Sequence, residues 1–425
     1  MNPHDPSTSP DPRSGLVLLV APARSYRVAS YQQACERLGY QLLVVSDSRH
    51  SLVSAIAQGI TVDFDDPAEA RRKVLEGLGN QRVVSVLATD DRVVGIASAL
   101  AEELGLPHNA ADSALLTRRK DLARQRLREA GCRVPRFRVL ALDEIPDQAE
   151  AIPYPAVIKP LMLSGSRGVM RANNPVELID AAQVLREILQ DEAGDDFERS
   201  HCLVEDYLEG EEIAFDGFVQ NGRLLPLALF DKPEPMTGPC FEESCYITPS
   251  RLPGRLRAEI FDEIERCCRA YGLSHGPIHA EARLSEQGVV LLEMASRTIG
   301  GQCGGILEFV LGEPLEDLVL KLSCGAAPPE PKKGLYAGVM MIPIPQAGLL
   351  KRVEGLLEAR RTPRVSDIEI HIQPGYELVP LPRGSSYLGF IFAQSESYDE
   401  TWQALRRAHA RLRFVTRPKW DLTPA

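Results

Sequence analysis

From Leu16 onward, short apolar segments alternate with amphipathic segments of helical spacing. LVLLVA and QLLVVSD have the apolar character of buried strands, and residues 25–38 between them repeat apolar side chains every three to four positions before Gly39. The helical segments DFDDPAEARRKVLEGLG and DRVVGIASALAEELGL flank a third strand, VVSVLATD. This alternation predicts a doubly wound α/β domain, which we place at residues 15–116. APARSYR follows the first strand in place of GxGxxG, so the dinucleotide fingerprint is absent.

Composition and charge exclude several classes of protein. A chain of 425 residues is expected to form about two to four domains. Its hydrophobic fraction of 44% and charged fraction of 25% are typical of a soluble globular protein. The formal net charge of −11 argues against bulk binding of nucleic acid or of an anionic membrane, because both require a wide positive surface. The 9 cysteines show no CxxC spacing, and we expect reduced thiols rather than disulfides or zinc ligands.

The first 14 residues are polar and rich in proline, and we expect a disordered tail there. The apolar run LVLLVAPA behind them is too short to span a bilayer. Acidic residues in the leader do not fit a cleaved signal peptide. We therefore expect a cytoplasmic protein without a membrane segment.

Beyond residue 116 the regular alternation ends. The patterns predict a helix at 117–130, a strand-rich stretch to about residue 220, helices ending near Tyr271 and Ser323, and a linker at 326–334. Residues 335–425 are expected to form a small α+β domain whose last helix lies at 402–412. The predicted fold class is therefore a multidomain combination of α/β and α+β units.

The segment KPLMLSGSRGVMRA, at 159–172, has the composition of an anion-binding loop. Gly165 and Gly168 permit unusual backbone dihedral angles, so successive N–H groups can converge on phosphate oxygens. Ser164 and Ser166 add hydroxyl donors. The Walker sequence GxxxxGK[ST] is absent, and most loops of this kind are only hairpin tips.

Lys159 and two carboxylates extend this candidate site. Strand alternation in PAVIKP directs Lys159 to the same face as Val157, which favours a phosphate contact over a lysine that extends to solvent. Glu205 and Glu212 flank a turn at Gly210. Carboxylates accept hydrogen bonds, so they suit an adenine amino group and ribose hydroxyls, although a solvated acidic face is the alternative.

The hairpin HAEARLSEQGVVLLEMASR brings two more carboxylates together. If 286–288 form a three-residue loop, Glu281 lies directly opposite Glu293 on one face of the hairpin. Opposed carboxylates repel unless a cation lies between them, and oxygen ligands favour Mg²⁺ or Mn²⁺. A register shift of one residue would separate them.

Arg297 follows this hairpin at once, in the sequence SRTIGGQCGG. An arginine can hold phosphoryl oxygens in a bidentate way. Gly300 and Gly301 precede an apolar helix whose N-terminal N–H groups could face an anion. These glycines could equally serve tight packing.

Taken in order, these motifs resemble those of the ATP-grasp superfamily. They are LLTRRKDLARQRLREAGCRVPRF with Lys120, VIKP, SGSRGV, VEDYLEGEE, HAEAR and LEMASRTIGG. The resemblance covers essentially residues 16–425, and the long C-terminal part is most similar to that of the dipeptide-forming L-amino-acid ligases. It implies a central ATP-grasp domain of two α+β lobes at 117–325, with a mobile lobe at about 155–230.

The resemblance also implies a role for each group. Contacts to ATP would come from Lys120, Lys159, Ser164, Gly165, Ser166, Arg167, Gly168, Glu205, Asp206, Tyr207, Leu208 and Glu212. Glu281 and Glu293 would bind the metal ions, and Arg297 would steady the transferred phosphoryl group. Arg167 is expected to reach the phosphates only when its loop closes. The family usually has asparagine where this chain has Ala295, so Ser296 or water would have to substitute at a second metal ion.

We therefore expect an ATP-dependent carboxylate–amine ligase. It would activate a carboxylate, that of an amino acid, as an acyl phosphate and join it to an amine, with release of ADP and phosphate. We expect the protein to form a homodimer. Candidate substrate contacts, which could instead be merely solvated, are Lys232, Glu242, Glu243, His275, Gly300 and Gly301.

Two other functions fit the same residues. A bicarbonate-activating, carboxylase-like enzyme is one, although the chain has no biotinyl-lysine motif AMKM. A nucleotide-binding regulatory protein without catalysis is the other, and Ala295 keeps it open.

Overall fold

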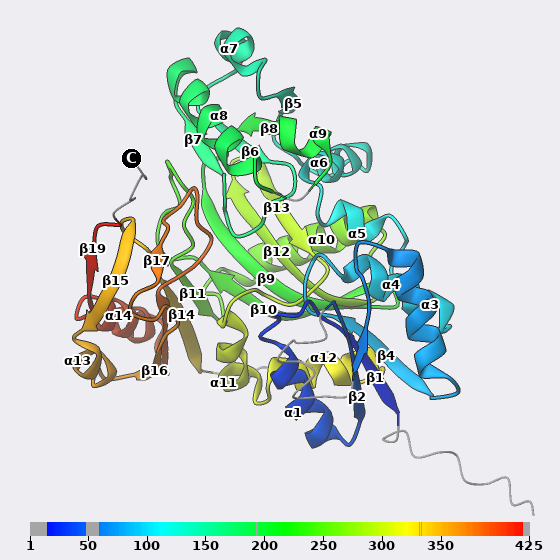
Figure 1. Cartoon of the computed structure of the whole chain (residues 1–425). Coiled ribbons are helices and arrows are strands. Elements are labelled where there is room, and N and C mark those ends of the chain that lie inside the picture. The colour runs from blue at the N-terminus through cyan, green and yellow to red at the C-terminus, as the bar shows by residue number, and fades with distance from the viewer. Residues whose placement is uncertain (1–14, 48–58, 193, 331, 333, 420–425) are drawn as a thin grey trace, which may run out of the picture.

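The structure, a computed structural model, describes residues 15–47, 59–192, 194–330, 332 and 334–419. The tail expected at 1–14 lies outside these residues. Within them the strands form four sheets, arranged around a central cleft between an upper lobe and a larger body (Figure 1). No helix of the described part is long and apolar enough to cross a membrane.

The N-terminal domain is the doubly wound unit that the sequence predicts. Its elements are β1 (Leu16–Val20), α1 (Val28–Leu38), β2 (Gln41–Ser46), β3 (Gly59–Thr61), α3 (Pro67–Leu78), β4 (Val83–Ala88), α4 (Val94–Glu103) and α5 (Ser113–Leu116). The strands are parallel in the order β3-β2-β1-β4, so the order reverses beside β1. In such sheets the crevice at the carboxyl ends of the strands near this reversal is where ligands commonly bind.

The upper lobe carries a four-stranded sheet in the order β5-β8-β6-β7. Its elements are β5 (Phe137–Ala141), α7 (Ile145–Gln148), η2 (Ala149–Ala151), β6 (Ala156–Pro160), β7 (Met170–Ala172), α8 (Pro175–Leu189), α9 (Asp196–Ser200) and β8 (His201–Asp206). The helix α6 (Lys120–Glu129) leads into it. The predicted helix at 117–130 starts late, because Arg119 has an extended backbone and α6 begins at Lys120.

An eight-stranded sheet forms the floor of the cleft, in the order β13-β12-β9-β10-β11-β14-β18-β16. Its first part comes from β9 (Glu211–Gln220), β10 (Arg223–Asp231), β11 (Cys245–Thr248), α10 (Gly254–Tyr271), β12 (Gly276–Ser285) and β13 (Gly288–Ala295), followed by η3 (Cys303–Ile306), α11 (Leu307–Leu311) and α12 (Leu315–Ser323). The bounds expected for the mobile lobe, about 155–230, need correction at both ends. β9 and β10 pair with floor strands, whereas β5, which begins before residue 155, pairs with β8 in the upper lobe.

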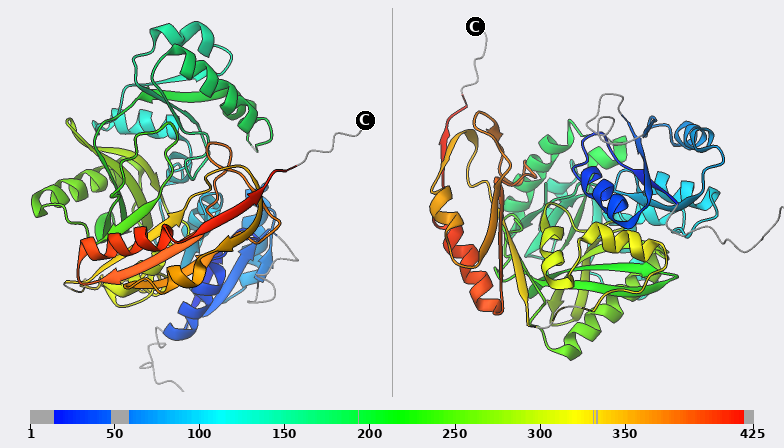
Figure 2. Two further views of the ribbon diagram at one scale, coloured as in Figure 1. Left: turned by 90° about the vertical axis from the view of Figure 1, so that its left-hand side faces the viewer. Right: turned by 90° about the horizontal axis from the view of Figure 1, so that it is seen from below.

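The C-terminal part continues the same floor. It consists of β14 (Tyr336–Ile342), β15 (Gly348–Glu354), α13 (Leu356–Arg360), β16 (Val365–Ile370), β17 (Glu377–Leu378), β18 (Gly389–Ser395), α14 (Tyr398–His409) and β19 (Arg413–Arg417). β14 pairs with β11, and β17, β15 and β19 form a separate sheet (Figure 2). The last helix begins four residues before the predicted position, at Tyr398, where Ser397 caps its N-terminus.

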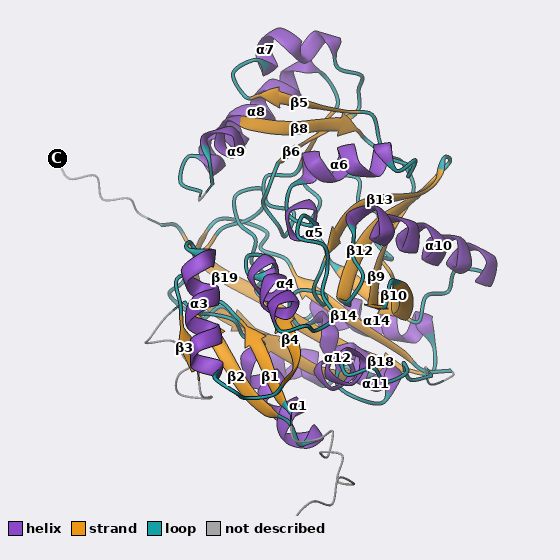
Figure 3. Cartoon of the chain, turned by 90° about the vertical axis from the view of Figure 1, so that its right-hand side faces the viewer, coloured by secondary structure: helices purple, strands orange, loops and turns teal. Residues whose placement is uncertain are grey.

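One hydrophobic core joins the N-terminal domain to the floor. Val17 and Leu19 from β1 and Tyr31 from α1 belong to the same buried cluster as Leu318 from α12 and Phe218 from β9. Figure 3 shows α1 and α12 on this side of the molecule. The packing holds the carboxyl ends of β1 and β4 next to the end of β13.

Candidate active site

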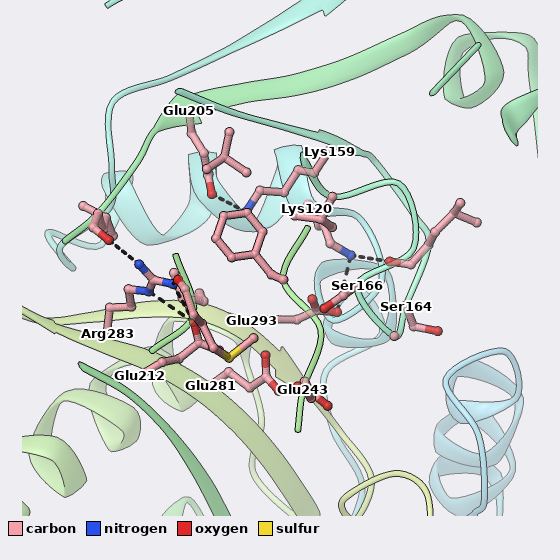
Figure 4. Close-up of a pocket in the computed structure, with 18 of the residues that line it drawn as sticks. Lys120, Lys159, Ser164, Ser166, Glu205, Glu212, Glu243, Glu281, Arg283 and Glu293 are labelled. Carbon is pink, nitrogen blue, oxygen red and sulfur yellow. Dashed lines mark hydrogen bonds and ion pairs between the residues drawn. The ribbon is translucent and has the colours of Figure 1, made fainter. Parts of the chain in front are cut away.

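A pocket lies between the upper lobe and the floor, and most of the predicted site residues line it (Figure 4). Those residues are Lys120, Lys159, Ser164, Gly165, Ser166, Glu205, Asp206, Tyr207, Leu208, Glu212, Glu243, Glu281, Glu293, Arg297 and Gly300. They come from segments almost 180 positions apart in sequence, so only the tertiary fold collects them.

The floor of the pocket carries the two opposed carboxylates. Glu281 on β12 pairs directly with Glu293 on β13, as the sequence predicts. The three-residue loop predicted at 286–288 is wrong. Ser285 pairs with Gly288, so the turn has two residues. A bulge between the turn and the glutamates adds one residue to β13 and restores the alignment.

The upper wall is built around Glu205, whose carboxylate lies between two cations. Arg124 donates from Nε to Glu205 Oε2 at 2.9 Å, and the Lys159 ammonium forms an ion pair with Oε1. Burial opposes ionisation of Glu205, but Arg124 and Lys159 outweigh it and lower its pKa to about 2. Burial, assisted by Arg124, lowers the pKa of Lys159. The carboxylate expected to receive an adenine amino group is thus already bound by two cations.

Two cations connect this wall to the hairpin of β12 and β13. Arg124 also donates to the carbonyl oxygen of Leu292, the residue next to Glu293, at 2.9 Å. Lys120, the first residue of α6, places its Nζ 2.6 Å from the Leu163 carbonyl oxygen and 3.4 Å from Glu293 Oε1. The start of α6 thereby connects the glycine loop, residues 163–169, to a carboxylate of the floor.

Lys232 lies beneath the pocket as a buried counter-ion. Its Nζ lies 2.7 Å from Glu212, 3.2 Å from Glu243 and 3.3 Å from Glu281. Burial disfavours its charge, but the three carboxylates raise its pKa well above the usual value. Burial, together with repulsion from Glu281, raises the pKa of Glu243 to about 7. Lys232 therefore offsets part of the negative charge of the floor and presents no free ammonium to a substrate.

His279 and Arg283 occupy the same face of β12 as Glu281, and both line the pocket. His279 Nδ1 lies 2.8 Å from Asp216, and despite burial this contact and Glu281 raise the pKa of the imidazole to about 9. Arg283 binds Glu212 at 3.1 Å. Neither residue was predicted from the sequence, although positions two before and two after Glu281 on a strand share its face.

An apolar slot adjoins Arg283. The Arg283 guanidinium lies 5.0 Å from the ring centroid of Tyr207 and donates to the carbonyl oxygens of Leu208 and Met236. Met236 and Phe241 line the slot as well. The irregular segment 231–250, which contains the predicted substrate contacts Lys232, Glu242 and Glu243, thus supplies apolar side chains to the side of the pocket near Glu205 and Glu212.

Arg297 closes the opposite end, held by the N-terminal domain. Its Nη2 and Nε lie 2.8 and 2.9 Å from Asp91 Oδ2, just after β4. Asp91 was not predicted, because nothing in the sequence places residue 91 beside residue 297. Gly300 lines the pocket, and the apolar helix expected after the two glycines is α11, which starts at Leu307 and is separated from Gly301 by the 3-10 turn η3.

The remaining candidates are not among the lining residues. Arg167 contacts Glu192 and the C-terminal part of the chain. Gly301 accepts a hydrogen bond from Tyr26, and His275 packs edge-on against Phe218. The other two are Gly168, which contacts Pro382, and Glu242, whose pKa is raised by burial.

Comparison with known protein families agrees with this geometry. The ATP-grasp domain family matches residues 152–306, which contain both glutamates of the hairpin, the glycine loop and Glu205. Residues 152–306 thus form an ATP-grasp domain. A second family, the L-amino acid ligase C-terminal domain 2, matches residues 340–417 of the chain.

Several known proteins resemble this chain. Carnosine synthase 1 from Gallus gallus is 28% identical over 73% of this chain and 36% of its own length, and alanine–anticapsin ligase from Bacillus subtilis is 25% identical over 64% and 61%. The chain thus spans less than two thirds of these relatives. The crystal structure of an L-amino acid ligase from Bacillus licheniformis has a TM-score of 0.77 at 23% identity, covering 95% of this chain and 99% of that one, which shows a shared fold.

The donor set of the ATP-grasp pocket fits a divalent metal. Two opposed carboxylates offer hard oxygen ligands, and an asparagine at the position of Ala295 would have added another. Ser296 is buried near Thr117, with the two hydroxyl oxygens 3.4 Å apart. Ala295 itself lines the pocket, so water could occupy the space that an asparagine side chain would fill.

Proposed function

We propose that this protein is an ATP-dependent carboxylate–amine ligase that acts on amino acids. The observation that carries the proposal is the pairing of Glu281 with Glu293 in a pocket that also holds the glycine loop, Lys120 and Arg297. Relatives named alanine–anticapsin ligase, dapdiamide A synthase and carnosine synthase support amide formation between amino acids as the reaction class.

The nucleotide is proposed to lie along the pocket from the apolar slot to the hairpin. Adenine would fill the slot formed by Tyr207, Leu208, Met236 and Phe241, with backbone groups at 206–208 as hydrogen-bond partners. Lys120 and the glycine loop would face the phosphates. Glu281 and Glu293 would hold Mg²⁺ or Mn²⁺, which when bound offsets negative charge on the transferring phosphoryl group.

The residues of this chain then act by positioning and charge. A substrate carboxylate attacks the terminal phosphorus of ATP, ADP leaves, and an acyl phosphate forms; the amine next attacks the acyl carbon and phosphate leaves. Arg297, held by Asp91, would orient and stabilise the transferring group. Glycine-loop residues would exclude water, which would otherwise hydrolyse the acyl phosphate.

The quaternary state, location and domain limits stay predictions. We propose a cytoplasmic homodimer. We also propose that the moving lobe is the unit with the β5-β8-β6-β7 sheet, roughly residues 137–206, because its strands pair with each other and not with the floor.

A regulatory nucleotide-binding protein is the second candidate, and Ala295 is the observation that favours it. The deciding experiment incubates the enzyme with MgATP and a matrix of amino-acid pairs, and measures phosphate release together with the mass of any coupled product. Phosphate and an amide product in equal amounts support the ligase. Nucleotide binding with no phosphate release for any pair, or for any carboxylic acid with ammonia, supports the regulatory protein.

A further inference from the structure

The glycine loop touches the C-terminal part of the chain directly. The Gly168 N–H donates to the Pro382 carbonyl oxygen at 2.9 Å, and Arg167 Nε donates to the Arg383 carbonyl oxygen at 2.8 Å. We call residues 379–387, between β17 and β18, the docking segment. It reaches up from the C-terminal sheet toward the upper lobe (Figure 1).

Two ion pairs surround this backbone contact. Arg383 of the docking segment pairs with Glu187 at the end of α8 at 2.5 Å. Arg167 of the glycine loop pairs with Glu192, just beyond that helix, also at 2.5 Å. A Cβ atom placed on Gly165 would lie 3.5 Å from the Cβ of Ser385. The docking segment therefore contacts the loop along its length and also the helix that supports it.

The hydrogen-bond pattern divides the loop into two parts. Gly168 uses its N–H for Pro382, and Val169 donates to the Ser166 carbonyl oxygen. The N–H groups of Gly165 and Ser166, in contrast, have no hydrogen-bond partner among the described residues, and both residues line the pocket with positive φ angles of 64° and 55°. One side of the loop is thus held by the C-terminal part, and the other side offers unused donors to the pocket.

We propose that the docking segment is a latch that holds the glycine loop over the pocket and so controls nucleotide release. Arg167 is a positioning residue in this arrangement, because it links the loop to the segment instead of reaching the phosphates. The inference rests on the proposed nucleotide site. A loop held in place loses less conformational freedom when ligand binds, and the bound nucleotide leaves only after the loop undocks.

An engineered disulfide tests the contact. The spacing at Gly165 and Ser385 falls at the lower end of the Cβ–Cβ range of about 3.5–4.5 Å found in disulfides. Gly165→Cys with Ser385→Cys, in a Cys324→Ser background, is oxidised with diamide while a fluorescent ADP analogue is bound. Gly165→Cys alone and Gly165→Cys with Ser386→Cys are the controls for other cysteine pairs.

We expect the cross-link in the 165–385 pair only, and at least about tenfold slower release of the ADP analogue, restored by dithiothreitol. Efficient cross-linking with unchanged release would overturn the latch, and so would absence of the cross-link in a folded variant. If the wild type binds no ADP analogue, the proposed nucleotide site fails, whereas the cross-link still reports docking.

A double-mutant cycle keeps the proposal testable should cysteine at residue 165 prevent folding. Arg167→Ala and Arg383→Ala are each expected to speed ADP release about two- to fivefold, as for exposed ion pairs, and less than additively together. Arg352→Ala, which removes an exposed arginine of β15, is the matched control with unchanged release. Additive effects would show that the two arginines act independently and would overturn the latch. An effect of Arg167→Ala on phosphoryl transfer alone would show that Arg167 acts on the phosphates instead.

Discussion

Glu281 lies directly opposite Glu293 across β12 and β13, although the turn that joins these strands would by itself align Glu281 with Leu292. The bulge supplies the missing residue, and the carbonyl oxygen of Leu292 is bound by Arg124. Arg124 in turn holds Glu205. The alignment of the candidate metal ligands is therefore connected to the opposite wall of the pocket through one buried arginine.

Replacing Glu293 by glutamine should abolish turnover while the fold survives. The amide keeps the shape of the side chain but removes a negative metal ligand, so we expect at least about a 100-fold loss of phosphate release with MgATP. Glu286→Gln, in the exposed turn of the same hairpin, is the control and should retain activity. Full activity of Glu293→Gln would contradict the metal assignment.

Ala295→Asn should strengthen metal binding. An amide oxygen at this position adds a ligand beside Glu293, and we expect the half-saturating Mg²⁺ concentration for phosphate release to fall by about tenfold. Ala295→Val has comparable bulk near Cβ without an oxygen and should not lower it. An unchanged Mg²⁺ requirement in the asparagine variant would show that water or Ser296 already completes the site.

Glu205→Gln should destabilise the protein and reduce its acid sensitivity. The pKa of Glu205 is lowered from 4.5 to about 2 in the folded state, so its stabilisation is present above pH 4.5 and is lost as pH falls toward 2. The shift corresponds to roughly 3 kcal/mol of unfolding free energy. Urea unfolding at pH 7 and pH 3 measures this free energy. The variant should have a lower free energy of unfolding than the wild type at pH 7, and should lose less of it between pH 7 and pH 3.

Glu69→Gln provides the comparison for that experiment. Glu69 pairs with Arg72 on the surface of α3, and such exposed pairs contribute little to stability, so the substitution should change the pH dependence of unfolding only slightly. An equal pH dependence of stability for wild type and Glu205→Gln would mean that the buried ion cluster does not act in the folded state as described.

Asp91→Asn should lower the rate of phosphoryl transfer. The substitution weakens the ion pair that orients Arg297, and misplacement of a transition-state ligand by a fraction of an ångström commonly costs about tenfold or more. We expect kcat to fall and the KM for ATP to change little. Asp65→Asn, which removes a surface ion pair with Arg92 in the same domain, should leave kcat unchanged. Equal losses in both variants would indicate a general effect on the N-terminal domain.

Local patterns predicted where several of the candidate residues lie. Lys159 lies on β6 facing the pocket with Val157, and the serines and Gly165 of the glycine loop line it. These outcomes depend on period-two alternation and on the backbone freedom of glycine, which are properties of adjacent residues. The three-residue turn failed because a bulge can compensate for a shorter turn, and the sequence of β13 carries no local mark of it.

The sequence by itself determined the strand and helix types, the motifs and their order, because these depend on periodicity and on residue chemistry. Only the tertiary structure decided which distant groups meet. It paired Asp91 with Arg297 and surrounded Lys232 with Glu212, Glu243 and Glu281. It also placed Arg167 against the docking segment and not in the pocket. Such contacts depend on the order of strands within the sheets and on how the sheets pack, so no local pattern predicts which buried charges become partners.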